Sequence, residues 1–182
     1  MVKRVLRYLK GHPRSIYMYP WIEETGILEV FSDSDWGGEK DKRRSTSGGV
    51  ILYGGHLIGH WSKLQNSPAP SSGEAELNAS SKAISEALSI RHFLEQMGIS
   101  VRIKLYLDAS AAKGTLLRRG AGKIKHLEIR QLWCQHAIER YDIEVLKIVR
   151  KLNLADSLTH VIGKRELSLF LEATGIKRKE EP

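Results

Sequence analysis

The sequence has one cysteine and no long hydrophobic run. A single cysteine, Cys134, excludes an intramolecular disulfide and a zinc site built from several cysteines, and its helical surroundings predict a small core side chain. No stretch of about 18 apolar residues is present, nor a secretory pattern of charged, apolar and small-residue segments. We therefore expect a soluble intracellular protein without a membrane partner, and the cytoplasmic particle and the nucleus both stay open as its location.

What the sequence does have is positive charge and enough apolar residues for a core. The 182 residues are 41% hydrophobic, which predicts one main domain. The formal net charge is +8, and the sequence pI is near 9.6. A basic surface attracts phosphate, so nucleic acid is the first candidate partner, although many basic proteins bind no polyanion. The residue pattern must decide.

Hydrophobic periodicity and turn residues predict three strands, a helix, a strand, further helices, a fifth strand and a helical end. The short connections of the first three strands favour an antiparallel meander, and the helical connections favour parallel pairing of the last two. This predicts an α/β fold with a mixed five-stranded sheet flanked by helices. We expect a basic helix and linker over residues 1–24, the domain over 25–176 and a charged tail over 177–182. The expected strands are 27–33, 49–53, 57–62, 101–108 and 143–149, and the main helices are 71–97, 109–118, 124–140 and the segment from 154.

Acidic residues stand in apolar contexts at three points of this pattern. Asp33 lies at the end of the first expected strand, Asp108 ends the fourth, and Glu76 lies near the start of the long helix. Aspartate is depleted in strands because it fits poorly on a half-buried pleated surface. The simplest explanation is that these acids converge on a metal site.

Seven short motifs follow one another along the chain: FSDSDW at 31–36, RRSTSGG at 43–49, WSK at 61–63, SSGEAEL at 71–77, LYLD at 105–108, KHLEIR at 125–130 and LADSLT at 154–159. In this order they resemble the ribonuclease H domain of copia-type retrotransposon Pol polyproteins. Residues 2–11 also resemble the segment that joins the reverse transcriptase to that domain. Each motif is weak alone, and their shared order makes the resemblance specific.

The resemblance implies a ribonuclease H-like fold with four catalytic, metal-binding acids, Asp33, Glu76, Asp108 and Asp156. Mg²⁺ prefers oxygen ligands, and two such ions hold the attacking water and the leaving oxygen in two-metal hydrolysis. We expect two Mg²⁺ ions, with Mn²⁺ as the second candidate. The implied enzyme is an endoribonuclease that hydrolyses the RNA strand of RNA:DNA hybrids during reverse transcription, with an upstream reverse transcriptase domain as a candidate partner.

Two neighbouring acids compete with the first two assignments. Asp35 has the same strand parity as Asp33 and could share or take its role. Glu74 could be confused with Glu76, but it completes a serine-to-glutamate capping pattern at the helix start, which gives it a structural purpose.

The other two acids have structural alternatives of their own. Asp108 could cap the helix that follows it. Asp156 could, together with Asn153, mark a helix start. The loop 150–153 contains no histidine, so the product-release histidine of cellular ribonucleases H has no counterpart there.

Two basic segments are candidate nucleic-acid contacts, because such contacts use cationic and hydroxyl groups on phosphates. For both segments a solvated surface is the alternative. Two other functions are also open: a catalytically inactive nucleic-acid-binding remnant, and a DNA-cutting integrase or resolvase with the same kind of site. The candidate residues are Arg43, Arg44, Ser45, Thr46, Ser47, Lys125, His126 and Arg130.

Overall fold

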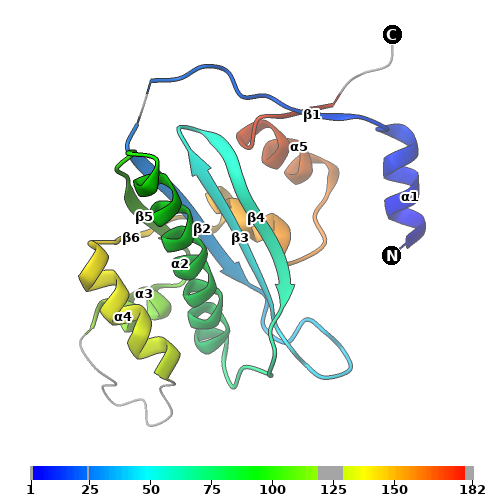
Figure 1. The fold of residues 1–182 in the computed structure, drawn as a ribbon. Helices are drawn as coiled ribbons and strands as arrows, with labels where there is room; N and C mark the ends of the chain where they lie inside the picture. The colour runs from blue at the N-terminus through cyan, green and yellow to red at the C-terminus, as the bar shows by residue number, and fades with distance from the viewer. Residues whose placement is uncertain (1, 24, 119–128, 179–182) are drawn as a thin grey trace.

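A five-stranded sheet forms the centre of the computed structural model, which describes residues 2–23, 25–118 and 129–178 except for the side chains of 130 and 131 (Figure 1). The strand order is β4-β3-β2-β5-β6. Antiparallel pairing joins β2 to β3 and β3 to β4, whereas β2–β5 and β5–β6 are parallel. The mixed sheet predicted from the sequence is confirmed. Its strands are β2 (Ile27–Ser34), β3 (Thr46–Tyr53), β4 (His56–Leu64), β5 (Arg102–Leu107) and β6 (Glu144–Lys147).

Helices cover both faces of this sheet (Figure 1). The long helix α2 lies on one face together with α3 and α4, and the short 3-10 helix η2 lies on the other face with α5 beside it. The helices are α1 (Val2–Gly11), α2 (Ser72–Gln96), α3 (Ser110–Leu117), α4 (Ile129–Tyr141), η1 (Arg150–Leu152), η2 (Leu154–Leu158) and α5 (Lys164–Ala173).

Strand β2 is buried on both faces. Successive side chains of a strand point to opposite faces, and here Val30 packs in the core under α2 while Phe31 packs in the second core, with Ala155 of η2 and Phe170 of α5. Burial from both sides fixes the register of β2 strongly, because a one-residue slip would exchange the two faces. The end of β2 is therefore a rigid place for a functional side chain.

The turn and cap residues lie where the sequence pattern placed them. Gly54 and Gly55 connect β3 to β4 with φ of 56° and 77°, a backbone region that glycine enters without steric cost. The hydroxyl of Ser71 accepts a hydrogen bond of 3.2 Å from the backbone N–H of Glu74 and caps α2. These contacts set the start of α2, and with it the position of Glu76.

A close approach of η2 to the sheet depends on Gly48 of β3. A Cβ atom built at Gly48 would lie 2.8 Å from the carbonyl oxygen of Ala155 and 2.8 Å from the methyl group of Thr159. Gly48 is also the register partner of Asp33 across β2 and β3. The absence of a side chain at this position lets η2 lie directly beside the end of β2.

Two short strands that the sequence pattern did not predict join the two ends of the chain. Strand β1 (Ser15–Tyr17) pairs antiparallel with β7 (Ile176–Arg178). This pairing joins the predicted N-terminal linker (1–24) to residues 176–178, where the predicted domain ends and the predicted tail begins. The expected final helix is two elements, η2 and α5, separated by residues 159–163.

Helix α1 projects from the body of the molecule (Figure 1), and none of its residues is buried. Its Arg4 donates a hydrogen bond of 2.8 Å to the carbonyl of Ile162. Within the described residues, no helix is both long and apolar enough to cross a membrane.

Candidate active site

Two of the predicted acids lie side by side because their strands are parallel neighbours. Phe31 of β2 pairs with Tyr106 of β5, and each of these residues stands two positions before an acid, Asp33 or Asp108. Asp33 is 4% exposed, and Asp108 directly follows the last residue of β5. The carboxyl ends of parallel strands meet at one edge of the sheet, where Asp33 and Asp108 come together.

Helix α2 brings a third acid to this edge. Glu76 is 8% exposed, and its Oε1 accepts hydrogen bonds from the backbone N–H and the hydroxyl of Ser34 at 3.2 and 3.1 Å. One carboxylate oxygen from each of Asp33, Glu76 and Asp108 lies within 4.8 Å of the others. We call these three residues the inner cluster.

Burial and mutual repulsion raise the pKa of every acid in the inner cluster. Burial, together with the nearby charges of Asp33 and Asp108, raises the pKa of Glu76 to about 8. The pKa of Asp33 and that of Asp108 are also raised, in both cases chiefly by burial. Three close carboxylates are costly to ionise together unless a cation balances them.

An unpartnered oxygen shows that this cluster suits a cation. The Oε2 atom of Glu76 is buried and has no hydrogen-bond partner among the residues that the structure describes. Buried carboxylate oxygens normally have a partner, so an oxygen left free among two other carboxylates is typical of a metal ligand. The donor set is oxygen only, and it is compatible with a hard divalent cation such as Mg²⁺. The identity of the ion stays a prediction.

The fourth predicted acid also lies near Asp33. Asp156 lies in η2, and its Oδ1 accepts a hydrogen bond of 2.9 Å from Nε of Arg150. Its Oδ2 lies 3.2 Å from Nε2 of His160. Ligand atoms of Asp33, Asp156 and His160 lie within 4.8 Å of one another. We call these three residues the outer cluster; it shares Asp33 with the inner cluster.

His160 is a site residue that the sequence pattern did not identify. The sequence pattern assigned His126 to nucleic-acid binding and showed no histidine in the loop before Asp156, whereas His160 lies four residues after Asp156. On the helix expected from residue 154, this spacing would place the two side chains on the same face. The spacing of Asp156 and His160 is therefore the sequence feature that could have predicted His160 as a site residue.

Asn153 ties η2 to the end of β2. Its side-chain amide donates a hydrogen bond of 3.0 Å to the carbonyl of Ser32, and its Oδ1 accepts one of 3.2 Å from the N–H of Ala155. The helix-start role considered for Asn153 is therefore present, with Asp156 in the first turn of η2. Capping η2 and presenting an acid to the site are compatible roles of one segment.

The structure separates the four acids from the neighbours that competed with them. Asp35 does not belong to either cluster; its Oδ1 accepts a hydrogen bond from the N–H of Thr46 and closes the connection between β2 and β3. Glu74 lies at the capped start of α2. Asp108 does not cap α3, whose N-cap residue is Ala109 without a side-chain hydrogen bond. The catalytic roles of Asp33, Glu76, Asp108 and Asp156 stay predictions.

Two of the predicted nucleic-acid contacts are turned inward. Ser45 is fully buried and its hydroxyl accepts a hydrogen bond of 3.1 Å from the N–H of Gly37, while Ser47 is 4% exposed and accepts one of 3.0 Å from the side chain of Gln65. These two hydroxyls hold the loop and the following strand together, so the expectation that they face a phosphate needs correction.

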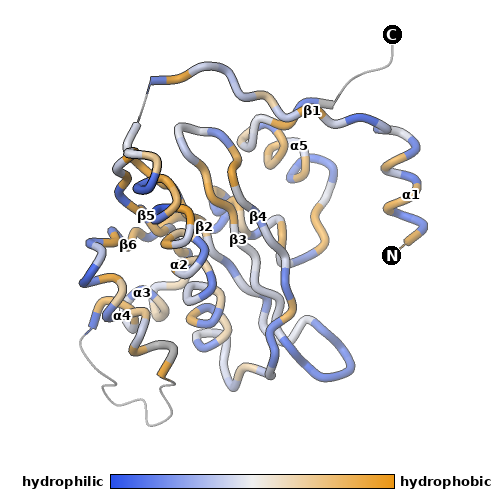
Figure 2. The backbone as a smooth tube through the Cα atoms, viewed as in Figure 1, coloured by the Kyte–Doolittle hydropathy of each residue, from blue (hydrophilic) through white to orange (hydrophobic). Residues whose placement is uncertain are grey.

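The rest of this basic segment is accessible. Arg43 is exposed, Thr46 is half-buried, and the half-buried Arg44 lies 3.8 Å from a carboxylate oxygen of Glu39. Figure 2 shows the connection between β2 and β3 as strongly hydrophilic. Of the second basic segment, Lys125 and His126 lie outside the described residues, as does the side chain of Arg130.

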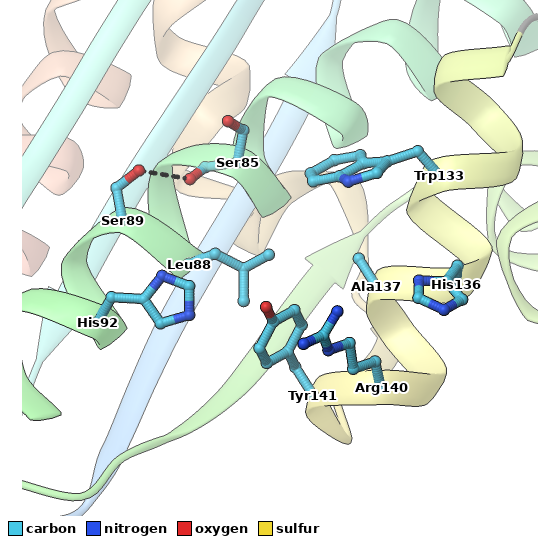
Figure 3. Close-up of a pocket in the computed structure, with 9 residues that line it drawn as sticks. All are labelled: Ser85, Leu88, Ser89, His92, Trp133, His136, Ala137, Arg140 and Tyr141. Atoms are coloured by element: carbon cyan, nitrogen blue, oxygen red, sulfur yellow. Dashed lines mark hydrogen bonds between the residues drawn. The ribbon is translucent and has the colours of Figure 1, made fainter.

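A separate cavity of about 250 Å³ lies between α2 and α4. Figure 3 shows His92 of α2 and His136 of α4 facing it, with Tyr141 between them. Trp133 also lines it and is 41% exposed. No member of either acidic cluster lines this cavity.

Comparisons with known proteins relate this arrangement to retrotransposons. No family model matches the sequence. The chain is 29% identical over 180 residues to the "Retrovirus-related Pol polyprotein from transposon TNT 1-94" of Nicotiana tabacum, which covers 96% of the chain and 13% of that protein. It is 29% identical over 181 residues to the corresponding polyprotein from transposon RE1 of Arabidopsis thaliana, covering 97% of the chain and 12% of the relative. These Pol polyproteins are homologues of the chain.

Solved structures identify the fold. Ribonuclease H1 LC11, isolated from compost by a metagenomic approach, has a TM-score of 0.58 at 16% identity, covering 74% of this chain and 93% of that protein. The same enzyme in complex with an RNA/DNA hybrid gives a TM-score of 0.52 at 15% identity, covering 72% and 92%. The chain therefore has the ribonuclease H fold, and the resemblance expected from its seven motifs is confirmed.

Proposed function

We propose that this chain is a metal-dependent endoribonuclease that hydrolyses the RNA strand of an RNA:DNA hybrid during retrotransposon reverse transcription. The observation that carries the proposal is the convergence of Asp33, Glu76 and Asp108 on one point of a ribonuclease H fold, with Asp156 beside them. The homologous Pol polyproteins support the retrotransposon setting. Because the chain spans 12–13% of their length, an upstream reverse transcriptase domain as partner is part of the proposal.

The carboxylates have separate tasks in this proposal. Asp33 belongs to both clusters and would contact both Mg²⁺ ions; Glu76 and Asp108 would hold one ion, and Asp156 the other. Bound Mg²⁺ ions would activate the attacking water and stabilise the negative charge that develops on the leaving oxygen. Ser34 orients Glu76 through two hydrogen bonds, and Thr159 orients Asp33 through a hydrogen bond of 2.5 Å from its hydroxyl to Oδ2. These contacts hold the ligands in place before the substrate arrives.

Substrate binding is proposed for the exposed part of the basic connection between β2 and β3. Arg43 has a φ of 54°, a left-handed conformation that costs a non-glycine residue on the order of 1 kcal/mol. An arginine at a position suited to glycine supports a role for its charge in holding a phosphate. We expect Arg43→Gly to leave the free energy of unfolding unchanged or higher. Hybrid binding should weaken, and the slope of the logarithm of the binding constant against the logarithm of the salt concentration should become less steep by about one.

The test is hydrolysis of a labelled RNA:DNA hybrid with Mg²⁺, with EDTA and the Asp33→Asn variant as controls. Cleavage by the wild type alone, leaving a 3′-hydroxyl and a 5′-phosphate, supports the proposal. Salt-dependent hybrid binding without cleavage would instead support an inactive nucleic-acid-binding remnant. Preferential cutting of duplex DNA in the same panel would support an integrase-like or resolvase-like enzyme.

A further inference from the structure

His160 gives the outer cluster a nitrogen donor that the inner cluster lacks. His160 lies two residues after η2, its side chain is 39% exposed, and its Nε2 is 3.2 Å from Oδ2 of Asp156. The inner cluster is composed of carboxylates alone. The two clusters therefore offer different chemistry to a cation, although they share Asp33.

The hydrogen bonds around Thr159 fix which ring nitrogen of His160 is free. The hydroxyl of Thr159 has one proton, and its shortest contact, 2.5 Å, is to the carboxylate of Asp33, so the proton lies there. The same oxygen is 3.1 Å from Nδ1 of His160, and it can only accept a hydrogen bond from this nitrogen. In the neutral ring, therefore, Nδ1 carries the proton and the lone pair is on Nε2, which faces Asp156.

The free nitrogen and the free oxygen are spaced as two ligands of one ion. Oδ1 of Asp156 is engaged by Arg150, which leaves Oδ2 for another partner. Adjacent ligands about 2.1 Å from an octahedral ion are about 3.0 Å apart. The observed 3.2 Å between Nε2 and Oδ2 is close to this separation. A hydrogen bond from the Nδ1–H to a neighbouring oxygen is the usual support of a metal-bound histidine.

We propose that Asp33, Asp156 and His160 form a binding site that prefers a first-row transition-metal dication to Mg²⁺. The inference rests on the proposed function, because it assigns a ligand to the second of its two cations. Imidazole binds transition metals well and Mg²⁺ poorly, whereas carboxylates suit both. The outer cluster would then respond to the kind of metal supplied, and the inner cluster would respond much less.

The experiment measures metal binding directly. Co²⁺ and Mg²⁺ are titrated by calorimetry into the full chain near pH 7.5, with the visible spectrum of Co²⁺ recorded in parallel. In His160→Ala and His160→Gln we expect the Co²⁺ affinity of one site to fall about tenfold or more and its spectrum to change. The Mg²⁺ affinity should change less than about twofold. His136→Ala, which removes an exposed histidine from the cavity between α2 and α4, is the matched control and should behave as the wild type.

Unchanged Co²⁺ affinity and spectrum in both His160 variants would overturn the proposal and leave His160 as a simple ion-pair partner of Asp156. An equal loss of Co²⁺ and Mg²⁺ affinity would also overturn it, because this would indicate a general disturbance of the site. Hybrid cleavage separates this inference from the proposed function. Metal binding as expected without cleavage would refute only the function, and cleavage with unaltered metal preference would refute only this inference.

Discussion

The inner and outer clusters share Asp33 but balance their charge differently. Glu76 of the inner cluster is buried, its carboxylate receives hydrogen bonds only from Ser34 in the described part of the chain, and its pKa is raised to about 8. Asp156 of the outer cluster already contacts two basic side chains, Arg150 and His160. The inner cluster therefore depends on a proton or a cation from outside, whereas the outer cluster already has a counter-ion, the guanidinium of Arg150.

The largest expected effect comes from the residue that the clusters share. Asp33→Asn removes one charged ligand from both cation sites, so we expect hybrid cleavage to fall by at least about 10³-fold. Single-turnover cleavage with Mg²⁺ is the measurement. Asp35→Asn is the matched control, because an amide oxygen still accepts the hydrogen bond from Thr46 and neither cluster contains Asp35. Equal losses in the two variants would contradict the assignment of Asp33.

The second largest expected effect is a pH dependence of stability, which tests whether the inner cluster needs a proton or a cation to balance its charge. The pKa of Glu76 is about 8 in the folded protein, compared with 4.5 for the unperturbed side chain. Between these two pH values the folded state therefore binds more protons than the unfolded state. The free energy of unfolding of the metal-free protein should therefore fall as the pH rises through this window, by on the order of a few kcal/mol. Asp33 and Asp108 act in the same direction.

Glu76→Gln should remove much of this fall, because glutamine is neutral at every pH. Urea unfolding in EDTA between about pH 5 and pH 8 measures the slope for both proteins. Added Mg²⁺ should stabilise the wild type most at the upper end of this window, where the carboxylates are otherwise hardest to ionise. Parallel slopes for the wild type and the variant would show that Glu76 does not titrate as expected.

A smaller effect should separate the clusters structurally. Asn153→Ala leaves the carbonyl of Ser32 and the N–H of Ala155 without their partner, which should cost about 1–3 kcal/mol. It also releases η2, so binding at the outer cluster should weaken more than binding at the inner one. Calorimetric metal titration and thermal unfolding are the measurements. Asn153→Ser keeps an N-cap acceptor and should lose less; a larger loss than in the alanine variant would argue against the capping role.

The smallest effect concerns the counter-ion of the outer cluster. The Arg150 side chain is 68% exposed, so Arg150→Gln should change the free energy of unfolding by less than about 1 kcal/mol. Mg²⁺ affinity should rise a few-fold, because the guanidinium no longer occupies Oδ1 of Asp156 or repels the cation. Arg165→Gln, on the exposed side of α5, is the control for lost surface charge. Weaker Mg²⁺ binding in Arg150→Gln alone would reverse the expected sign.

The strands and the long helix were predictable because their local signals agree with their burial. Val30 and Phe31 give β2 apolar side chains on both faces, Gly54 and Gly55 mark the hairpin, and Ser71 marks the start of α2. The short strands β1 and β7 were missed. The three residues of β1 are all exposed, so no buried face imposes a pattern on them.

The candidate site was predictable to the extent that its residues disturb a local pattern. Asp33 and Asp108 are acids beside apolar strands, and the structure brings them together with Glu76. His160 was not predictable in this way, because a histidine in an exposed segment breaks no hydrophobic pattern. Its position beside Asp33 depends on how η2 packs against the sheet. Ser45 and Ser47 illustrate the opposite failure, since nothing in a hydroxyl-rich loop reveals which side chains turn inward.

Gly48 has a consequence for how the two cations would be spaced. It faces Asp33 across the sheet, and the elements that would meet its Cβ belong to the segment that carries Asp156 and His160. A methyl group there, as in Gly48→Ala, would force that segment to shift while leaving every ligand chemically intact. Gly48 binds no ligand, but because it has no side chain it determines how close Asp156 and His160 lie to Asp33. It would thereby also determine the spacing of the two cations.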